Sequence, residues 1–135
     1  MMRQSNNSQI ALIHRLRELG VRADHKVQAA IKQIDPSRLQ QNILALEEYA
    51  LKEPLKNPIA AFLKSVRQNW QPRNDRQAWW DKATAVFGKE KRDRLINFVT
   101  EINKEATVYF CNGKAISLTL ALSMSWDQIE KLATA

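Results

Sequence analysis

The sequence predicts a mainly helical α+β domain of six to seven helices with one β-hairpin near its C-terminal end. Hydrophobic residues make up 44% of the 135 residues, which is enough to build a core. Only three glycines and four prolines interrupt the chain, and this composition favours helices over many short strands. Apolar residues recur at helical spacing along most of the chain, and the pattern changes only after residue 106.

The first three predicted helices begin at residues that can cap a helix N-terminus. Ser8 can cap a first helix that Gly20 ends, and Asp24 can cap a short second helix. Asp35, followed by a proline, opens a third helix, which ends before Pro54. The inward-facing positions of the three helices are Leu12, Ile13, Leu16, Leu19, Val27, Ala30, Ile31, Ile34, Leu39, Ile43, Leu46 and Ala50.

The fourth predicted helix has the clearest boundaries. Asn57 can serve as its N-cap, and Pro58 fits the first helical position, where its missing N–H costs nothing. Pro72 ends it, since the residue before a proline avoids the helical region. Its apolar face carries Ile59, Phe62, Leu63, Val66 and Trp70. Lys64 and Arg67 lie on the other face, which is therefore positively charged.

The second half begins after a hinge at residues 71–75, so we expect a four-helix module at 1–73 and a second part at 74–135, packed as one compact unit. Asn74 or Asp75 can cap a fifth helix, which Gly88 stops. A sixth helix is predicted over residues 89–104.

A hairpin is predicted where residues 107–110 and 114–120 flank Asn112-Gly113. A two-residue loop would place Val108 and Ile116 on opposite faces, whereas a three-residue loop with Gly113 left-handed places them on one face, and we favour the second. Residues 115–124 fit a strand or a helix.

Ser125 with Gln128 resembles a capping box and opens a last short helix. The predicted order of the second half, two helices and then a hairpin, is typical of the end of a winged-helix domain. The hairpin carries only Lys114 at its tip, so a core or dimer element is the alternative.

The net charge of +7, from 21 Lys and Arg against 14 Asp and Glu, favours acidic partners, with nucleic acid first. The excess is +5 in residues 1–75 (12 against 7) and +2 in residues 76–135 (9 against 7). A second cluster lies at residues 89–94, where a phosphate contact would explain positive charge at a helix N-terminus; a solvated face partly neutralised by Glu90 and Asp93 is the alternative. The candidate contacts are Lys56, Lys64, Arg67, Arg73, Arg76, Lys89, Lys91, Arg92, Arg94 and Lys114.

Trp79 and Trp80 point about 100° apart on a helix, so both cannot be central in one core face. One of them can be exposed beside Arg73 and Arg76, where it could stack on a base or fill the pocket of a protein partner. Packing of the fifth helix between two neighbours is the alternative. A second functional hypothesis is therefore a helical protein–protein adaptor or regulator that uses an exposed tryptophan as its anchor.

The sequence gives no reason to expect an enzyme. His14 and His25 lack metal ligands at suitable spacing, and no phosphate-binding glycine loop or convergent acid, base and nucleophile occurs. We therefore expect no cofactor and no metal. Cys111, the single cysteine, excludes an internal disulfide and is expected to be a buried residue of a strand. The chain has no apolar signal core and no run of about 18 apolar residues, so we expect a cytoplasmic protein without a membrane span.

The residues that carry a family resemblance are Leu19-Gly20-Val21, Ile34-Asp35-Pro36, Arg38, Ile43, Lys56-Asn57-Pro58, Phe62-Leu63, Val66 and Trp70. Through them, residues 16–73 resemble the helical module of bacterial plasmid and phage replication proteins of the primosomal DnaD-like group. This resemblance implies DNA binding, or contact with replication partners, without catalysis. It also implies that Lys64 and Arg67 make the contacts. We therefore expect a non-enzymatic nucleic-acid-binding protein, with DNA favoured over RNA, that acts in replication or its regulation.

Overall fold

The computed structural model describes the backbone of residues 2–135 and the side chains of residues 9–101 and 103–135. The described residues form eight helices and three strands, so the mainly helical α+β class is confirmed, whereas the predicted six to seven helices and single hairpin are too few. The elements are α1 (Met2–Glu18), α2 (His25–Gln33), α3 (Pro36–Lys52), α4 (Pro58–Arg67), α5 (Asp75–Phe87), α6 (Lys89–Leu95), β1 (Ile96–Ile102), β2 (Glu105–Phe110), β3 (Ala115–Ser117), α7 (Leu118–Leu122) and α8 (Trp126–Thr134).

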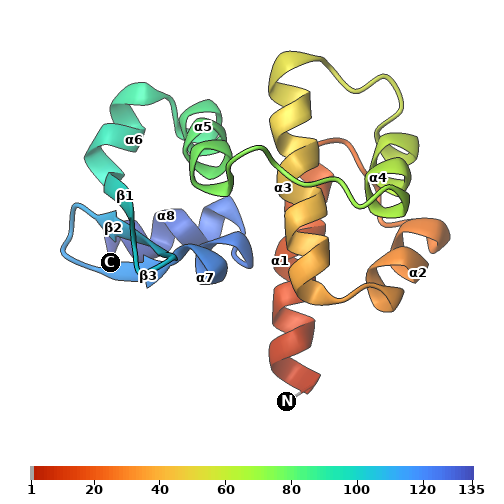
Figure 1. The fold of residues 1–135 in the computed structure, drawn as a ribbon, viewed down its shortest axis with the longest axis horizontal. Helices are drawn as coiled ribbons and strands as arrows, with labels where there is room; N and C mark the ends of the chain where they lie inside the picture. The colour runs from red at the N-terminus through yellow and green to blue at the C-terminus, as the bar shows by residue number, and fades with distance from the viewer. Residues whose placement is uncertain (1) are drawn as a thin grey trace.

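The buried apolar residues form two clusters that meet at α3. Helices α1 to α4 enclose the first cluster, in which Leu12, Ile43 and Phe62 are fully buried. The second joins Leu44 of α3 to residues 78–133 of the remaining helices and the sheet. Figure 1 accordingly shows α2 and α4 on one side of α3, and the sheet with α5 to α8 on the other, where α3 packs against α5.

The helix caps form largely as their sequences predict. Asp24, Asn57 and Asn74 each accept a hydrogen bond from the backbone N–H three residues later, at 2.9, 3.1 and 3.0 Å. Ser125 and Gln128 form both bonds of the capping box that begins α8. The start of α1 was predicted wrongly, because the helix begins at Met2 rather than after Ser8, whose side chain lies outside the described residues.

Helix α4 ends at Arg67, earlier than the proline at position 72 indicated. Asn69 takes a left-handed conformation (φ 50°) and closes the helix as a Schellman motif, in which the Trp70 N–H donates to the Ser65 carbonyl at 2.8 Å. The Asn69 side-chain oxygen then accepts hydrogen bonds from Arg38 Nε and Asn42 Nδ2 of α3, at 3.1 and 3.0 Å. The end of α4 is thus fixed to α3 by the residue that stops the helix.

The predicted helix over residues 89–104 is wrong in its second part. Helix α6 ends at Leu95, and the chain continues as strand β1, which pairs antiparallel with β2. The turn between the strands is made by Asn103 and Lys104, both with positive φ (54° and 67°), as a two-residue hairpin turn of type I′ requires. The β-branched and aromatic residues of β1 suit a strand, and pairing with β2 satisfies its backbone.

The predicted hairpin is present with the three-residue loop that the sequence favours. The Phe110 N–H donates to the Lys114 carbonyl at 2.8 Å, Gly113 has φ 90°, and Val108 pairs with Ile116. The strand ends at Ser117, which caps α7, so residues 115–124 form a short strand and then a helix. Cys111 is exposed in the loop, which corrects the prediction of a buried strand residue.

The sheet is a meander in the order β1-β2-β3, and two helices follow it. This order differs from the helix–helix–hairpin pattern of a winged-helix end that the sequence indicated, because β1 occupies the second part of the predicted sixth helix.

A buried ion pair joins the two sides of α3. The Arg15 guanidinium of α1 and the Glu47 carboxylate of α3 are both 0% exposed and form a bidentate pair, in which Nε donates to Oε2 at 3.2 Å and Nη2 to Oε1. Arg15 Nη1 donates to the Leu122 carbonyl of α7 at 2.7 Å, and its guanidinium lies 5.6 Å from the Trp126 ring centroid. One side chain therefore links α1, α3, α7 and α8.

Candidate nucleic-acid interface

The exposed side of α4 carries two of the predicted contact residues. Lys64 and Arg67 are both exposed in the last turns of α4, and Lys56 is exposed in the connection that precedes it. Residues 54–70 contain these three cations and no Asp or Glu. Because no carboxylate in this stretch offsets them, the positive charge stays available to a ligand.

Helix α2 packs beside α4 and extends this surface. Arg22, Lys26 and Lys32 are exposed on or just before α2. The carboxylates of this region, Asp24 and Asp35, cap the N-termini of α2 and α3 and face backbone N–H groups. We call the six exposed cations of this surface the α2–α4 basic face; they are Arg22, Lys26, Lys32, Lys56, Lys64 and Arg67.

A hollow of about 400 Å³ lies on this face between the two helices. Asp24 and His25 line it from the start of α2, and Asn57 and Ala60 line it from the start of α4. Both helix N-termini, which carry the positive ends of the helix dipoles, therefore meet at the same surface as the cations. The summed potential of the α2–α4 basic face favours an anionic ligand.

The predicted cluster at residues 89–94 does not form a comparable surface. Lys91 pairs with Glu130 of α8 at 2.7 Å. Arg92, whose side chain is only 12% exposed, donates to Thr84 at 2.7 Å and to Asp93 at 2.6 Å. Among the described residues, Lys89 and Arg94 are exposed and make no ion pair. Two of the four predicted cations are thus occupied by the protein itself.

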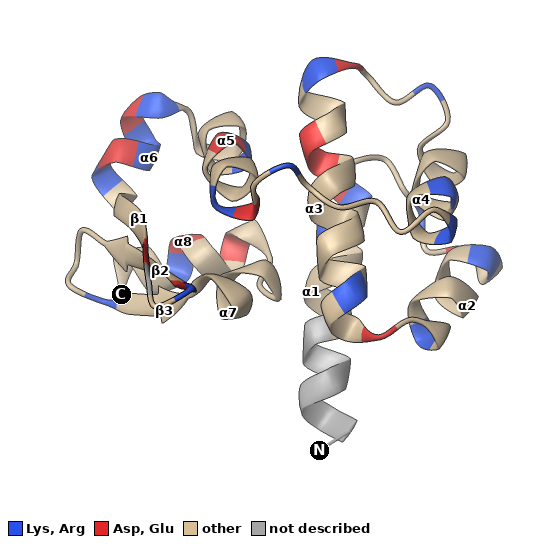
Figure 2. Ribbon diagram, viewed as in Figure 1, with Lys and Arg blue, Asp and Glu red and all other residues tan. Residues whose placement is uncertain are grey.

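The ten predicted cations do not lie together. Figure 2 shows the basic positions of α4 at one end of the molecule and those of α6 at the other, with α3 and α5 between them. Arg73 is exposed in the connection before α5, and its backbone N–H donates to Glu48 at 3.4 Å. Lys114 is exposed at the tip of the β2–β3 hairpin. The structure therefore divides the predicted site into separate parts.

The two adjacent tryptophans have different surroundings, as their helical spacing requires. Trp79 is 0% exposed and packs on Trp126 with ring centroids 5.2 Å apart, so it cannot contact a ligand. Trp80 is half-buried beneath the Arg92 guanidinium, which lies 4.3 Å from its ring centroid. Of the pair, Trp80 is the one that reaches the surface.

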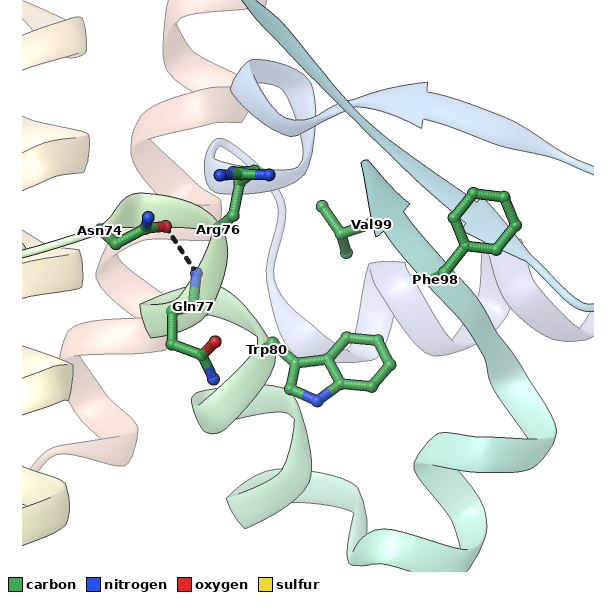
Figure 3. Close-up of a pocket in the computed structure, with 6 residues that line it drawn as sticks. All are labelled: Asn74, Arg76, Gln77, Trp80, Phe98 and Val99. Atoms are coloured by element: carbon green, nitrogen blue, oxygen red, sulfur yellow. Dashed lines mark hydrogen bonds between the residues drawn. The ribbon is translucent and has the colours of Figure 1, made fainter. Parts of the chain in front are cut away.

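Trp80 lines a hollow of about 350 Å³ between α5 and β1, which we call the α5–β1 hollow (Figure 3). Its remaining lining residues are Asn74, Arg76, Gln77, Phe98 and Val99. Arg76, another predicted contact residue, is half-buried there. The hollow thus combines one indole ring, one guanidinium and two carboxamides, with Phe98 at its border.

The outer face of the sheet carries an aromatic pair that the sequence analysis missed. Phe98 of β1 and Tyr109 of β2 are cross-strand partners whose rings stack with centroids 4.7 Å apart and an interplanar angle of 24°. Phe98 is 46% exposed, and Thr100 and Thr107 beside the pair are half-buried. The alternation of Phe98, Thr100 and residue 102 was the available signal, but residue 98 had been assigned to a helix.

Glu18 of α1 lies close enough to the buried ion pair for the Arg15 and Glu47 charges to influence it. Partial burial raises the pKa of the Glu18 carboxyl, and the nearby Glu47 and Asp127 carboxylates raise it further, while Lys82 of α5 opposes the shift.

No group of three or more His, Cys, Asp or Glu side chains suited to a metal ion occurs among the described residues.

The comparisons with known proteins give no relative. No family model matches the chain, and neither a curated protein nor a solved structure matches it. Within the described residues, no helix is long and apolar enough to cross a membrane.

Proposed function

We propose that this chain is a non-enzymatic nucleic-acid-binding protein that takes DNA as its ligand and holds the phosphate backbone with the α2–α4 basic face. The observation that carries the proposal is the exposure of Lys64 and Arg67 in a stretch, residues 54–70, that has no acidic residue. Phosphate contacts of this kind supply affinity that does not depend on base sequence and that falls with salt.

A role in replication or its regulation is part of the same proposal. Its support is the resemblance of residues 16–73 to the DnaD-like module, since this segment includes all six residues of the α2–α4 basic face. The resemblance also supports DNA over RNA.

The test is a double charge reversal, Lys64→Glu with Arg67→Glu, followed by fluorescence anisotropy with labelled DNA over a salt series. A plot of the logarithm of the binding constant against the logarithm of the salt concentration has a negative slope, and loss of two phosphate contacts should make that slope less steep by about 1.4 to 1.8. The matched control reverses Lys104 and Lys131, exposed residues of the second half, and changes the net charge equally. Circular dichroism checks that both variants fold.

We expect a large loss of affinity in the α4 variant and a small one in the control. Equal losses in both variants would mean that net charge, rather than this face, attracts the DNA. Unchanged affinity in the α4 variant would refute the assignment.

A second candidate function is a protein–protein adaptor. The observation that favours it is a hollow of about 370 Å³ beside α3, lined by Tyr49, Lys52 and Trp70 among others, in which Tyr49 is 43% exposed. Exposed aromatic residues of this kind are typical anchors of protein interfaces. The adaptor hypothesis predicts binding that survives high salt, which the same salt series distinguishes from phosphate binding.

A further inference from the structure

The α5–β1 hollow has a different chemistry from the α2–α4 basic face. Figure 3 shows Arg76 and Trp80 on opposite sides of the hollow and the Val99 side chain pointing toward them from β1, whereas Phe98 borders the hollow with its ring turned to the other side of the strand. The lining contains one cation and no carboxylate. The α5–β1 hollow therefore offers aromatic surface and one positive charge, whereas the α2–α4 basic face carries six cations.

We propose that the α5–β1 hollow receives an unpaired nucleobase of a single strand, so that the protein prefers single-stranded over duplex nucleic acid. This inference rests on the proposed function, and it assigns base contact to residues other than those that hold phosphates. Stacking on an aromatic ring accepts any base, because every base has a π-face.

Trp80 retains surface for such a contact. Arg92 lies over the indole at 4.3 Å, and Trp80, which is only half-buried, lines the hollow together with residues other than Arg92. Phe98 borders the hollow from β1 and turns its ring to the outer sheet face, where it is stacked on Tyr109 and still 46% exposed. A base would cover surface that now faces water.

The two carboxamides leave hydrogen-bonding atoms that can meet a base edge. The Asn74 side-chain oxygen accepts from the Gln77 N–H at 3.0 Å, and Asn74 Nδ2 donates to no described residue. Gln77 Nε2 donates to Asp81 at 2.8 Å, and Gln77 Oε1 accepts from no described residue. One donor and one acceptor are therefore spare at the rim, where the Arg76 guanidinium can bind the adjoining phosphate.

A duplex cannot use this arrangement, because its base faces are stacked within the helix and its paired edges are occupied. An unpaired strand presents both. The Phe98–Tyr109 stack continues from the hollow onto the outer sheet face, and it offers a second aromatic surface to the next base.

The test compares three labelled ligands of equal length by anisotropy at one salt concentration: single-stranded DNA, a strand of abasic sites with the same phosphates, and a duplex. We expect the wild-type protein to bind the single strand at least about tenfold more tightly than the abasic strand. Phe98→Ala should remove about tenfold of the affinity for the single strand and leave the abasic strand unchanged. Leu120→Ala is the matched control, since Leu120 is also exposed (49%) but lies on α7.

The outcomes separate this inference from the proposed function. Equal binding of the single and abasic strands by the wild-type protein would overturn the nucleobase assignment and leave phosphate binding intact. This comparison needs no variant, so it decides the question even where Phe98→Ala fails to fold. Duplex binding as tight as single-strand binding would also overturn it. If none of the three ligands binds at low salt, the proposed function fails and this inference fails with it.

Discussion

Replacing Glu47 by alanine should lower the free energy of unfolding by about 3–5 kcal/mol, because it leaves the Arg15 guanidinium buried without its charge partner. Both side chains are 0% exposed, so water cannot take the place of the carboxylate without opening the packing. Of the contacts of the guanidinium, only the Leu122 carbonyl and the Trp126 ring would remain. The free energy of unfolding of a small domain is about 5–15 kcal/mol in total, so this loss is a large part of its stability.

The double replacement Arg15→Met with Glu47→Leu should cost far less than Glu47→Ala alone. It removes both charges together and fills the space with apolar atoms, a change that is often neutral or stabilising by about 1–4 kcal/mol. The Leu122 carbonyl loses its donor, which costs about 1–3 kcal/mol and offsets that gain. We therefore expect a change within about 2 kcal/mol of the wild-type free energy of unfolding.

Urea denaturation followed by tryptophan fluorescence measures both effects, since the Trp126 ring lies beside the Arg15 guanidinium. The midpoint and the slope should both be recorded, because a change in slope would indicate a change in the unfolded state or loss of two-state behaviour. If Glu47→Ala lowers the free energy of unfolding by less than about 1 kcal/mol, the reasoning is refuted, because an effect this small is typical of ion pairs exposed to water.

Two further variants test the surroundings of this pair and the end of α4. The pKa of Glu18 is raised in the folded protein, so ionising Glu18 lowers stability as the pH rises through that pKa. Glu18→Gln should therefore raise the free energy of unfolding at pH 7, by less than about 1 kcal/mol because the side chain is exposed. At pH 3, where the carboxyl is protonated, the substitution should leave the free energy of unfolding unchanged. Urea titrations at the two pH values measure both effects. Asn69→Gly keeps the left-handed conformation but removes the side-chain oxygen that accepts hydrogen bonds from Arg38 and Asn42. It should lower the free energy of unfolding by about 1 kcal/mol, measured by thermal unfolding. A higher free energy of unfolding would mean that these two hydrogen bonds contribute nothing.

The helix starts could be predicted from the sequence because their signals are local. An Asp or Asn side chain caps the N–H groups two or three residues ahead, so the choice at Asp24, Asp35, Asn57 and Asn74 depends on a few neighbouring residues. The same holds for Gly113, whose positive φ sets the length of the hairpin loop.

The strand β1 could not be predicted in this way, because its sequence fits two periodicities. Leu95, Phe98, Val99 and residue 102 recur at helical spacing, whereas Phe98, Thr100 and residue 102 alternate as in a strand. The decision comes from pairing with β2, which lies beyond a turn made by Asn103 and Lys104. Asn-Lys lacks the glycine that usually marks a type I′ turn, so the hairpin gives little local signal.

The candidate site was less predictable than the fold, since a count of charges along the chain does not say which of them are neutralised. Lys91 meets Glu130 of the last helix, and Arg92 meets Thr84 and the Trp80 ring of the helix before it. Those partners are eight or more residues away in sequence. The basic run at residues 89–94 therefore resembles a binding site in the sequence, although two of its cations contact other helices of the protein.

Arg15 illustrates the same difficulty from the other side. It lies between Leu12 and Leu16 on the apolar face of α1, so the sequence placed a charge where the core would be, and only the position of Glu47 on α3 explains it. A charged residue on an apolar stripe is thus a signal for a buried partner. Residues 54–70 show the opposite case, a stretch that has cations and no acidic residue. There the tertiary contacts leave Lys64 and Arg67 exposed, so their positive charge stays at the surface.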